Sequence, residues 1–379
     1  MIDGRWRSAR RILAIRLDNL GDVLVTTPAI HAIKRSLPLA EIVLLASPVG
    51  AQAARLNPDL AGVIEYDAPW VDPWQRLPHD SARELAIVEQ LRAEQFDAAV
   101  IFTSFRQSSL PAAYLAYLAD IPLRLGLSID ASGSLLTTRQ RPLDIPLHEV
   151  ERGLDLVAQV GLTTDEIDLV LEVPADAANA AATWLSTQGI PPAGIRRGPL
   201  VVVHPGCSMP ARTAPPEQFA EIVTALIERL EATVVLTGTD DELDLVTSII
   251  DRLPPSIRPS AFAAAGTFAF PAFCGLIQTA DLVVTNNTGP MHIAAALKTP
   301  VVVLFALTNP PEQWGPWRSP HRMLFHDVPC RLCYSRVCPH HQECLRLVST
   351  DQVIETVTTL LAERTSAGRE REAVAGGVA

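Results

Sequence analysis

The 379-residue chain lacks long apolar runs: no stretch of about 18 residues is apolar throughout. A helix that crosses a membrane needs roughly 20 such residues, so we expect no transmembrane segment. The first seven residues, MIDGRWR, also lack the apolar centre of a signal peptide. These absences predict a cytoplasmic protein, whose contact with a membrane, if there is any, is weak and peripheral.

The chain is also short of positive charge. It has 31 Lys and Arg residues against 42 Asp and Glu residues, which gives a net charge of −11. A general nucleic-acid or polyanion binder needs a basic excess, so we expect no nucleic-acid partner. Neither G-x-G-x-x-G nor G-x-x-x-x-G-K-[ST] follows any predicted strand. Dinucleotide oxidoreductases and P-loop NTPases therefore lose their main support.

The length suffices for two domains. Short apolar runs alternate with helical patterns along the chain, which predicts an α/β protein with two doubly wound parallel sheets. Three prolines and three glycines within residues 189–199 mark the expected boundary. We therefore expect an N-terminal domain over residues 1–190 and a second domain over 191–349. A helix over 350–365 should pack back toward the first domain, before a disordered tail over 366–379.

Three polar turns each follow a short buried strand: residues 16–22, 204–212 and 285–289. Ligands of doubly wound sheets bind at the carboxyl ends of strands, so a cleft between the domains would bring the three turns together. In the third turn, Pro290 suits the first position of a helix, and the unpaired N–H groups there suit a phosphate. An ordinary capped connection between strand and helix is the alternative.

Together the turns resemble glycosyltransferase family nine, the ADP-heptose:lipopolysaccharide heptosyltransferases. RLDNLGDVLVTTPA at 16–29 matches R-x-(S/D)-x-L-G-D-V-x-x-(T)-x-P-A, and HPGCSMPAR at 204–212 is similar to H-P-G-(A)-S-x-x-(A)-K. NNTGPMHIAAAL at 286–297 resembles (N)-D-(S/T)-G-P-M-H-(L/I)-A-A-A-L. The resemblance covers roughly residues 11–361. It implies a GT-B fold, two Rossmann-like domains facing a central cleft. It also implies inverting transfer of a heptose or related sugar from a nucleotide-diphosphate donor to a glycan or lipopolysaccharide-type acceptor.

Asp22 is the candidate general base. A carboxylate at a strand-to-helix turn can remove the proton of an acceptor hydroxyl as that oxygen attacks the anomeric carbon. The resemblance places the family's catalytic aspartate at this position. A first helical turn stabilises the anion, which makes Asp22 a weak base unless burial opposes the effect. The alternative is an acidic residue that merely suits the helix dipole. Gly21 beside it would let the backbone approach a phosphate.

Arg212 is the second candidate catalytic residue, because it corresponds to a family lysine that steadies the diphosphate leaving group. Negative charge grows on that group in the transition state, so a fixed cation lowers the barrier. Arginine keeps the charge of lysine but presents a different donor fork. A surface arginine without this role is the alternative.

The candidate phosphate ligands lie in the second and third turns. Thr288, Gly289 and Met291 would offer backbone N–H groups, and Ser208 would offer its hydroxyl. His292 either donates to the diphosphate or packs as an ordinary buried histidine.

Two further residues are candidate ligands of the donor's sugars. Asn287 stands where the family commonly has aspartate; an amide cannot carry the charge but can still bind a sugar hydroxyl. Asp240 suits the nucleotide ribose, with a solvated carboxylate at a helix start as the alternative.

Four of the six cysteines crowd together as Cys330-x2-Cys333-x4-Cys338-x5-Cys344. Four thiolates at this spacing can form a tetrahedral zinc or iron site, in which His340 or His341 could replace one ligand. The resemblance implies that such a metal is structural and that catalysis needs no cofactor. Buried free thiols and reactive thiols are the alternatives.

Two other functions stay open from the sequence alone. An epimerase or phosphorylase can use the same GT-B architecture. A catalytically altered sugar-nucleotide-binding protein would explain why Arg212 and Asn287 depart from the family pattern.

Overall fold

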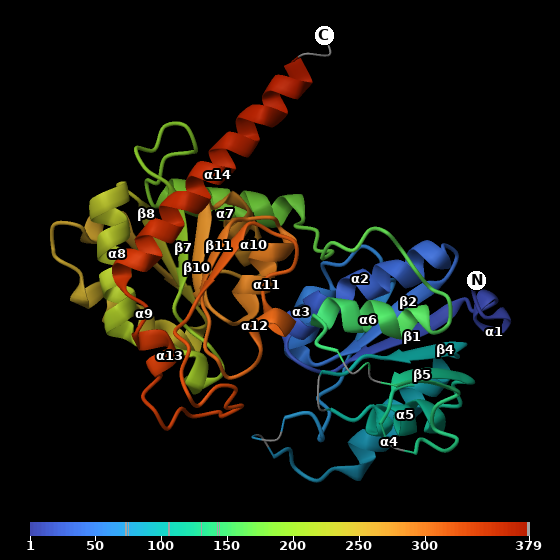
Figure 1. Cartoon of the computed structure of the whole chain (residues 1–379). Coiled ribbons are helices and arrows are strands. Elements are labelled where there is room, and N and C mark those ends of the chain that lie inside the picture. The colour runs from blue at the N-terminus through green and yellow to red at the C-terminus, as the bar shows by residue number, and fades with distance from the viewer. Residues whose placement is uncertain are drawn as a thin grey trace. The chain divides into compact units, whose positions relative to one another are not determined.

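The computed structural model describes residues 1–72, 74, 76–104, 107–129, 131–141, 143 and 145–376. The chain divides into two compact units, Met1–Glu172 and Val173–Ala379. Each unit is built on one parallel sheet, and Figure 1 shows helices lying over both faces of each sheet. No helix among the described residues is both long and apolar enough to cross a membrane.

The first unit contains six strands in the order β3-β2-β1-β4-β5-β6, and every neighbouring pair is parallel. The strands are β1 (Arg11–Arg16), β2 (Glu41–Ala46), β3 (Gly62–Glu65), β4 (Ala98–Ile101), β5 (Leu123–Leu127) and β6 (Thr138–Gln140). The helices are α1 (Gly4–Arg7), α2 (Leu20–Ser36), α3 (Pro48–Ala54), α4 (Ser81–Ala93), α5 (Leu110–Leu118) and α6 (Glu149–Ala158). The core strand β1 is buried on both faces, which explains why its sequence is a continuous apolar run.

The second unit contains six parallel strands in the order β12-β11-β10-β7-β8-β9. The strands are β7 (Leu200–His204), β8 (Thr233–Gly238), β9 (Ala261–Ala265), β10 (Leu282–Asn286), β11 (Val301–Leu304) and β12 (His321–Leu324). The α-helices are α7 (Ala175–Thr187), α8 (Pro216–Leu230), α9 (Leu243–Arg252), α10 (Phe270–Thr279), α11 (Gly289–Ala296), α12 (Pro311–Trp314), α13 (Glu343–Arg346) and α14 (Thr350–Gly376). Short 3-10 turns are η1 (Pro210–Arg212), η2 (Asp240–Glu242) and η3 (Arg258–Ser260).

Both sheets follow the same strand order when strands are counted from the start of each unit. The chain first builds outward from β1 to β3, or from β7 to β9, and then crosses back to add strands on the other side. The order reverses between β1 and β4 and between β7 and β10, and ligands of such sheets bind outside the carboxyl ends of these strands. The residues after these four strands are therefore where a site is expected.

The domain boundary differs from the expected position near residue 190. Contacts place it between Glu172 and Val173, so α7 belongs to the second unit. The physical reason is that α7 packs tightly on α10, where a Cβ on Gly275 would lie 3.0 Å from the carbonyl oxygen of Ala177. The proline- and glycine-rich segment at 189–199 connects α7 to β7 within that unit.

The C-terminal helix also differs from expectation. α14 continues to Gly376, beyond the expected end at residue 365. It packs on α8, β11 and β12 of its own unit, and Arg364 donates to the carbonyl oxygens of Ala280 and Asp281. Packing toward the first domain concerns the placement of the two units and stays a prediction.

We expect Phe219→Ala to destabilise the second unit strongly. Phe219 of α8 is fully buried in its core, so the substitution leaves a cavity and lowers the free energy of unfolding by about 3–5 kcal/mol. The control is Leu243→Ala, because Leu243 is 51% exposed and its loss should change stability by at most about 0.5 kcal/mol. Denaturant unfolding followed by circular dichroism measures both, and equal losses would contradict the described core.

Candidate functional site

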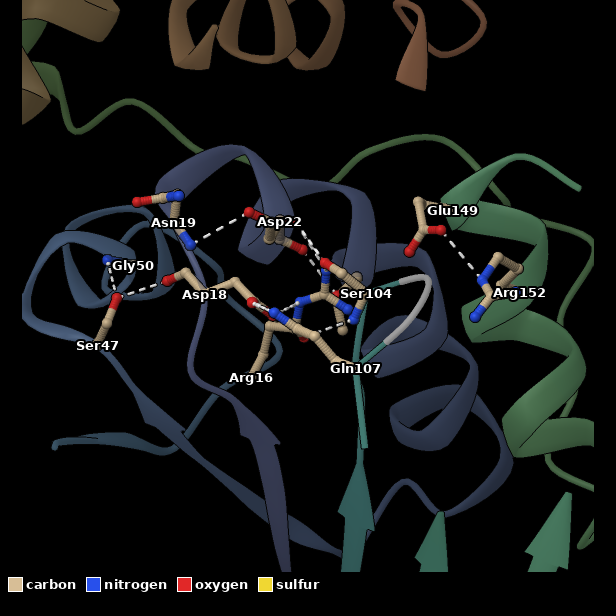
Figure 2. A network of polar contacts seen from close by, with 11 residues as sticks. Arg16, Asp18, Asn19, Asp22, Ser47, Gly50, Ser104, Gln107, Glu149 and Arg152 are labelled. Carbon is tan, nitrogen blue, oxygen red and sulfur yellow. Dashed lines mark hydrogen bonds and ion pairs between the residues drawn. The ribbon is translucent and has the colours of Figure 1, made fainter. Parts of the chain in front are cut away.

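The carboxyl end of β1 carries a buried arginine shared by two carboxylates, shown in Figure 2. The Arg16 side chain is 3% exposed; its Nε lies 3.0 Å from Asp18 Oδ2, and its Nη2 lies 2.8 Å from Asp22 Oδ1. A buried cation is costly unless it is paired. Burial works to lower the pKa of Arg16, but Asp18 and Asp22 outweigh it and raise that pKa, so the guanidinium stays charged.

Asp22, the predicted base, lies in the first turn of α2 beside the half-buried Gly21. Its Oδ1 accepts from Arg16 and, at 3.0 Å, from the hydroxyl of Ser104. Its Oδ2 accepts from the backbone N–H of Asn19 at 3.1 Å. Each of these bonds, and the helix N-terminus, favours the ionised carboxylate. The residue therefore also fills the structural role that the sequence left open, since it caps its own helix.

Ser104 and Gln107, in the connection between β4 and α5, complete this cluster and were not identified from the sequence. Gln107 accepts from the Ser104 N–H at 2.9 Å and donates to Asp18 Oδ1. Burial raises the pKa of Asp18, which Arg16 opposes and Asp22 reinforces. The signal that could have found them is position: they follow the strand that pairs with β1, but that pairing is not visible in the sequence.

The second turn begins at the carboxyl end of β7 with His204, which is 8% exposed. Its Nδ1 lies 3.1 Å from Thr237 Oγ1, and its Nε2 lies 3.8 Å from Glu242 Oε2. Burial lowers the pKa of His204, with Glu242 opposing the effect. A Cβ at Gly206 would lie 1.9 Å from Glu242 Oε1, so a larger residue here would displace the Glu242 carboxylate.

Arg212 reaches from the second turn to the residues that follow β11. Its Nε donates to Thr308 Oγ1 at 2.9 Å, and the Thr308 hydroxyl donates to Asn309 Oδ1 at 3.2 Å. Cys207 hydrogen-bonds the side chain of Thr288, while burial raises the pKa of its thiol. The predicted second and third turns therefore meet within the second unit.

Ser208 is exposed in the second turn, as a phosphate ligand would need to be. In the third turn, Asn286 was not among the predicted residues. It ties the two turns together: its Oδ1 accepts from the Ala214 N–H at 3.1 Å, and its Nδ2 donates to the Pro205 carbonyl at 2.7 Å.

Asn287 is engaged within the protein. It is 4% exposed, its Oδ1 accepts from the Ala306 N–H at 3.1 Å, and its Nδ2 lies 3.4 Å from Asn309 Oδ1. Its predicted bond to a donor hydroxyl would compete with these contacts and stays a prediction.

The backbone donors predicted for a diphosphate are also partly engaged. The Thr288 N–H donates to the Asn286 carbonyl at 2.9 Å, and the Met291 N–H to the Thr288 carbonyl at 3.0 Å. Gly289 opens α11, where N–H groups have no acceptor within the helix. The side chains of Met291 and His292 are 1% and 5% exposed. Gly289 thus fits the predicted backbone role best.

Asp240 is exposed at the start of η2. Its Oδ1 lies 2.0 Å from where a Cβ of Gly266 would stand, so the carboxylate lies against that glycine, which adopts a φ of +65°. The arrangement matches the alternative of a solvated carboxylate at a helix start, and its binding of a ribose stays a prediction.

The four clustered cysteines line one small cavity together with residues of the second turn and of the segment after β11. The lining includes Cys330, Cys333, Cys338, Cys344, His340, Ala211 and Thr308. Burial raises the pKa of the Cys344 thiol. Among the described residues, no three or more His, Cys, Asp or Glu side chains are arranged to hold a metal ion. The donor set suits zinc or iron, but the described arrangement is not a formed metal centre.

The loop that carries the cysteines is also hydrogen-bonded, through its backbone, to the second turn and to the segment after β11. The Ala211 N–H donates to the Arg336 carbonyl at 2.8 Å, and the Tyr334 N–H donates to the Thr308 carbonyl at 2.9 Å. Arg212 is therefore flanked on both sides by residues bonded to this loop.

Comparison with known proteins agrees with this architecture. The profile of glycosyltransferase family 9 (heptosyltransferase) matches residues 84–343. Lipopolysaccharide heptosyltransferase 3 of Escherichia coli (strain K12) is 24% identical over 298 residues, 78% of this chain and 82% of that protein. The solved family 9 glycosyl transferase of Veillonella parvula DSM 2008 has a TM-score of 0.76 at 20% identity, covering 96% of this chain and 98% of that one. E. coli ADP-heptose lps heptosyltransferase II has a TM-score of 0.74 at 21% identity, covering 94% and 99%.

Two doubly wound sheets that match these structures define the GT-B fold. The chain belongs to glycosyltransferase family 9 (heptosyltransferase), because the family profile spans more than half of it. The resemblance read from the three turns is thereby confirmed, although residues 16–22 lie outside the matched range. Convergence of the turns from both units in one cleft stays a prediction.

His204 gives a test by pH. Its imidazole is held neutral in the folded state, whereas the unfolded chain binds a proton as pH falls below about 6.5. Its contribution to stability is therefore complete above that pH and is lost as the pH falls through it. We expect the midpoint of thermal unfolding to fall less between pH 7.5 and 5.5 in His204→Gln than in the unchanged protein.

The matched control is His79→Gln, which removes an imidazole that is exposed in the fold. The control should keep the pH dependence of the unchanged protein. An identical fall in both variants would contradict the neutral, buried state of His204.

Proposed function

We propose that this glycosyltransferase moves a heptose from a nucleotide-diphosphate donor to a hydroxyl of a lipopolysaccharide-type acceptor, with inversion at the anomeric carbon. Support comes from membership of the heptosyltransferase family and from relatives named for this activity. One of the similar solved structures is an ADP-heptose lps heptosyltransferase, so ADP-heptose is the donor that we expect here. We further propose that the protein works at the cytoplasmic side of a membrane with only peripheral contact.

The observation that carries this proposal is the position of the Asp22 carboxylate at the switch point of the first sheet, where it accepts hydrogen bonds from Arg16, Ser104 and the Asn19 N–H. In the proposed reaction, Asp22 takes the proton of the acceptor hydroxyl while that oxygen forms a bond to the anomeric carbon. The bond from this carbon to the donor's diphosphate breaks at the same time, and the electron pair leaves with the nucleoside diphosphate. Attack opposite to the leaving group inverts the configuration.

The second unit would hold the leaving group. Arg212, fixed by its bond to Thr308, would stabilise the charge that grows on the diphosphate. Ser208 and the N–H of Gly289 are the proposed phosphate ligands. The transfer moves one proton and one glycosyl group, and the proposed steps use only side chains and backbone groups of the protein.

Asp22→Asn tests the base. The amide keeps the shape of the carboxylate but cannot take the proton, so we expect transfer to fall by about 10²–10⁴-fold. Donor binding, measured by calorimetry with ADP-heptose, should persist. The matched control is Asp165→Asn in the same unit, an exposed carboxylate that should leave turnover unchanged. Normal turnover in Asp22→Asn would rule out the base.

Product analysis separates transfer from the other functions that the GT-B fold supports. Mass spectrometry with labelled ADP-heptose and lipopolysaccharide core acceptors should find the sugar on the acceptor. An isomerised nucleotide sugar would indicate an epimerase instead. Donor binding without any product would indicate a protein that has lost the reaction.

We also propose that Cys330, Cys333, Cys338 and Cys344 hold a structural zinc or iron ion. The support is that four thiols, the ligands these metals prefer, line one cavity. The ion would tie the loop together and take no part in the transfer.

Metal analysis of the purified protein tests this site. We expect about one zinc or iron per chain, lost in Cys333→Ser together with a lower midpoint of thermal unfolding. Cys274→Ala is the control, because Cys274 lies in α10 outside the cluster and should keep the metal. The proposal would be refuted if the unchanged protein contained no metal and unfolded at the same temperature as the Cys333→Ser variant.

A further inference from the structure

The Arg16 guanidinium forms ion pairs with two acidic residues, of which only Asp22 is the proposed base. Its Nε lies 3.0 Å from Asp18 Oδ2, and its Nη2 lies 2.8 Å from Asp22 Oδ1. All three side chains are largely shielded from water, with exposed fractions of 3%, 9% and 14%. In such surroundings the cation and the second carboxylate act on Asp22 in opposite directions: Arg16 favours its ionised form, and a charged Asp18 disfavours it.

Ser104 joins the same two groups. Its hydroxyl accepts from Arg16 Nη2 at 2.7 Å and donates to Asp22 Oδ1 at 3.0 Å. Among the described residues, Asp22 Oδ1 therefore accepts from two donors, whereas Oδ2 accepts only from the N–H of Asn19. A carboxylate oxygen has two lone pairs, so Oδ2 keeps one of them available for a further hydrogen bond. Figure 2 shows Ser104 and Arg16 converging on the same side of Asp22.

Gln107 makes the arrangement rigid. It holds the backbone N–H of Ser104 at 2.9 Å with its carbonyl oxygen and donates to Asp18 with its amide nitrogen. One side chain thus sets the distance between the hydroxyl that serves Asp22 and the carboxylate that competes for Arg16.

Among the residues that the structure describes, α6 contributes two further charged groups beside this cluster. Glu149 also stabilises the charge of Arg16, and its Oε1 lies 3.0 Å from Arg152 Nε. Because Glu149 and Arg152 form an ion pair, their opposite charges partly offset each other's effect on Asp22. The described residues that β4 and the connection after it contribute here, Ser104 and Gln107, are uncharged.

We propose that Asp18 and Ser104 are positioning residues that set the basicity of Asp22 through Arg16 and leave Oδ2 as the atom that takes the acceptor's proton. This inference rests on the proposed function, because it concerns the base of that reaction. Ser104 keeps Asp22 ionised and oriented, and Asp18 draws off part of the Arg16 charge so that Asp22 can still accept a proton.

The two residues therefore have opposite effects, which a structural role alone would not produce. In Ser104→Ala the carboxylate loses a donor, so the acidic limb of the pH profile of kcat moves to higher pH. In Asp18→Asn the competing charge is gone and Arg16 serves Asp22 alone, so that limb moves to lower pH. We expect displacements of about 0.5–1 pH unit in opposite directions. The weaker base in Asp18→Asn should also lower the plateau of kcat.

Conservative and control variants sharpen the test. Ser104→Thr retains the hydroxyl and should restore the profile of the unchanged protein. Ser108→Ala removes a hydroxyl from the same connection, but that hydroxyl accepts only from the Leu110 N–H and its loss should have no effect. Circular dichroism at pH 7.5 verifies that each variant is folded.

A second readout is independent of turnover. In protein labelled with 13C at the aspartate carboxyl carbon, the Asp22 resonance is the one that Asp22→Asn removes. Its titration midpoint should move up in Ser104→Ala and down in Asp18→Asn, without any substrate present. Movement in the same direction, or none, would overturn the inference. The titration midpoints could move as expected while neither the unchanged protein nor any variant transfers heptose. In that case the proposed function fails, and the effect of Asp18 and Ser104 on the titration of Asp22 stands.

Discussion

The burial of one guanidinium at the end of β1 constrains the whole first unit. A charge as deeply buried as that of Arg16 is tolerated only where carboxylates and polar groups surround it. Satisfying that need draws Asp18 and Asp22 from the turn after β1, and Ser104 from the connection after the neighbouring strand β4, into one cluster. The same requirement that stabilises the buried cation therefore assembles the cluster that contains the proposed base.

In the second unit, side-chain amides and hydroxyls form the hydrogen bonds that hold the second and third turns in place. Asn286 and Asn287 bond backbone groups on both sides of the third turn, and Thr308 fixes Arg212. Within this scaffold, Arg212 donates to the hydroxyl of Thr308. A fixed cation of this kind suits a ligand whose negative charge increases during the reaction.

The sequence predicted the fold class, because strands buried on both faces appear as uninterrupted apolar runs such as residues 200–203. It did not reveal the strands β6, β9 and β12, which lie at or next to the sheet edges and are polar, alanine-rich or short. The domain boundary was misplaced because proline and glycine mark breaks in secondary structure, whereas the units divide where packing stops. α7 lies before the proline-rich segment but packs on α10, and no local pattern encodes that contact.

The sequence predicts those residues of the candidate site that belong to a recognisable motif. It does not predict the residues that contact them from distant segments of the chain. Asp22 and Arg212 stand in turns that follow obvious strands, so their positions could be read directly. Ser104 and Gln107 belong to no recognisable motif. The pairing of β4 with β1 places them beside residues 16–22, and that pairing is not visible in the sequence. Asn287 is the opposite case. It belongs to a motif, but its side chain is hydrogen-bonded to the protein's own backbone.

The backbone bonds from the cysteine loop to Ala211 and Thr308 have a mechanical consequence. These bonds hold Ala211, which precedes Arg212, and Thr308, which Arg212 contacts. The rigidity of the second turn therefore depends on the cysteine loop, a segment that need not contact a ligand. Substitutions in that remote segment can therefore change the conformation of the second turn while the residues of the turn itself stay the same.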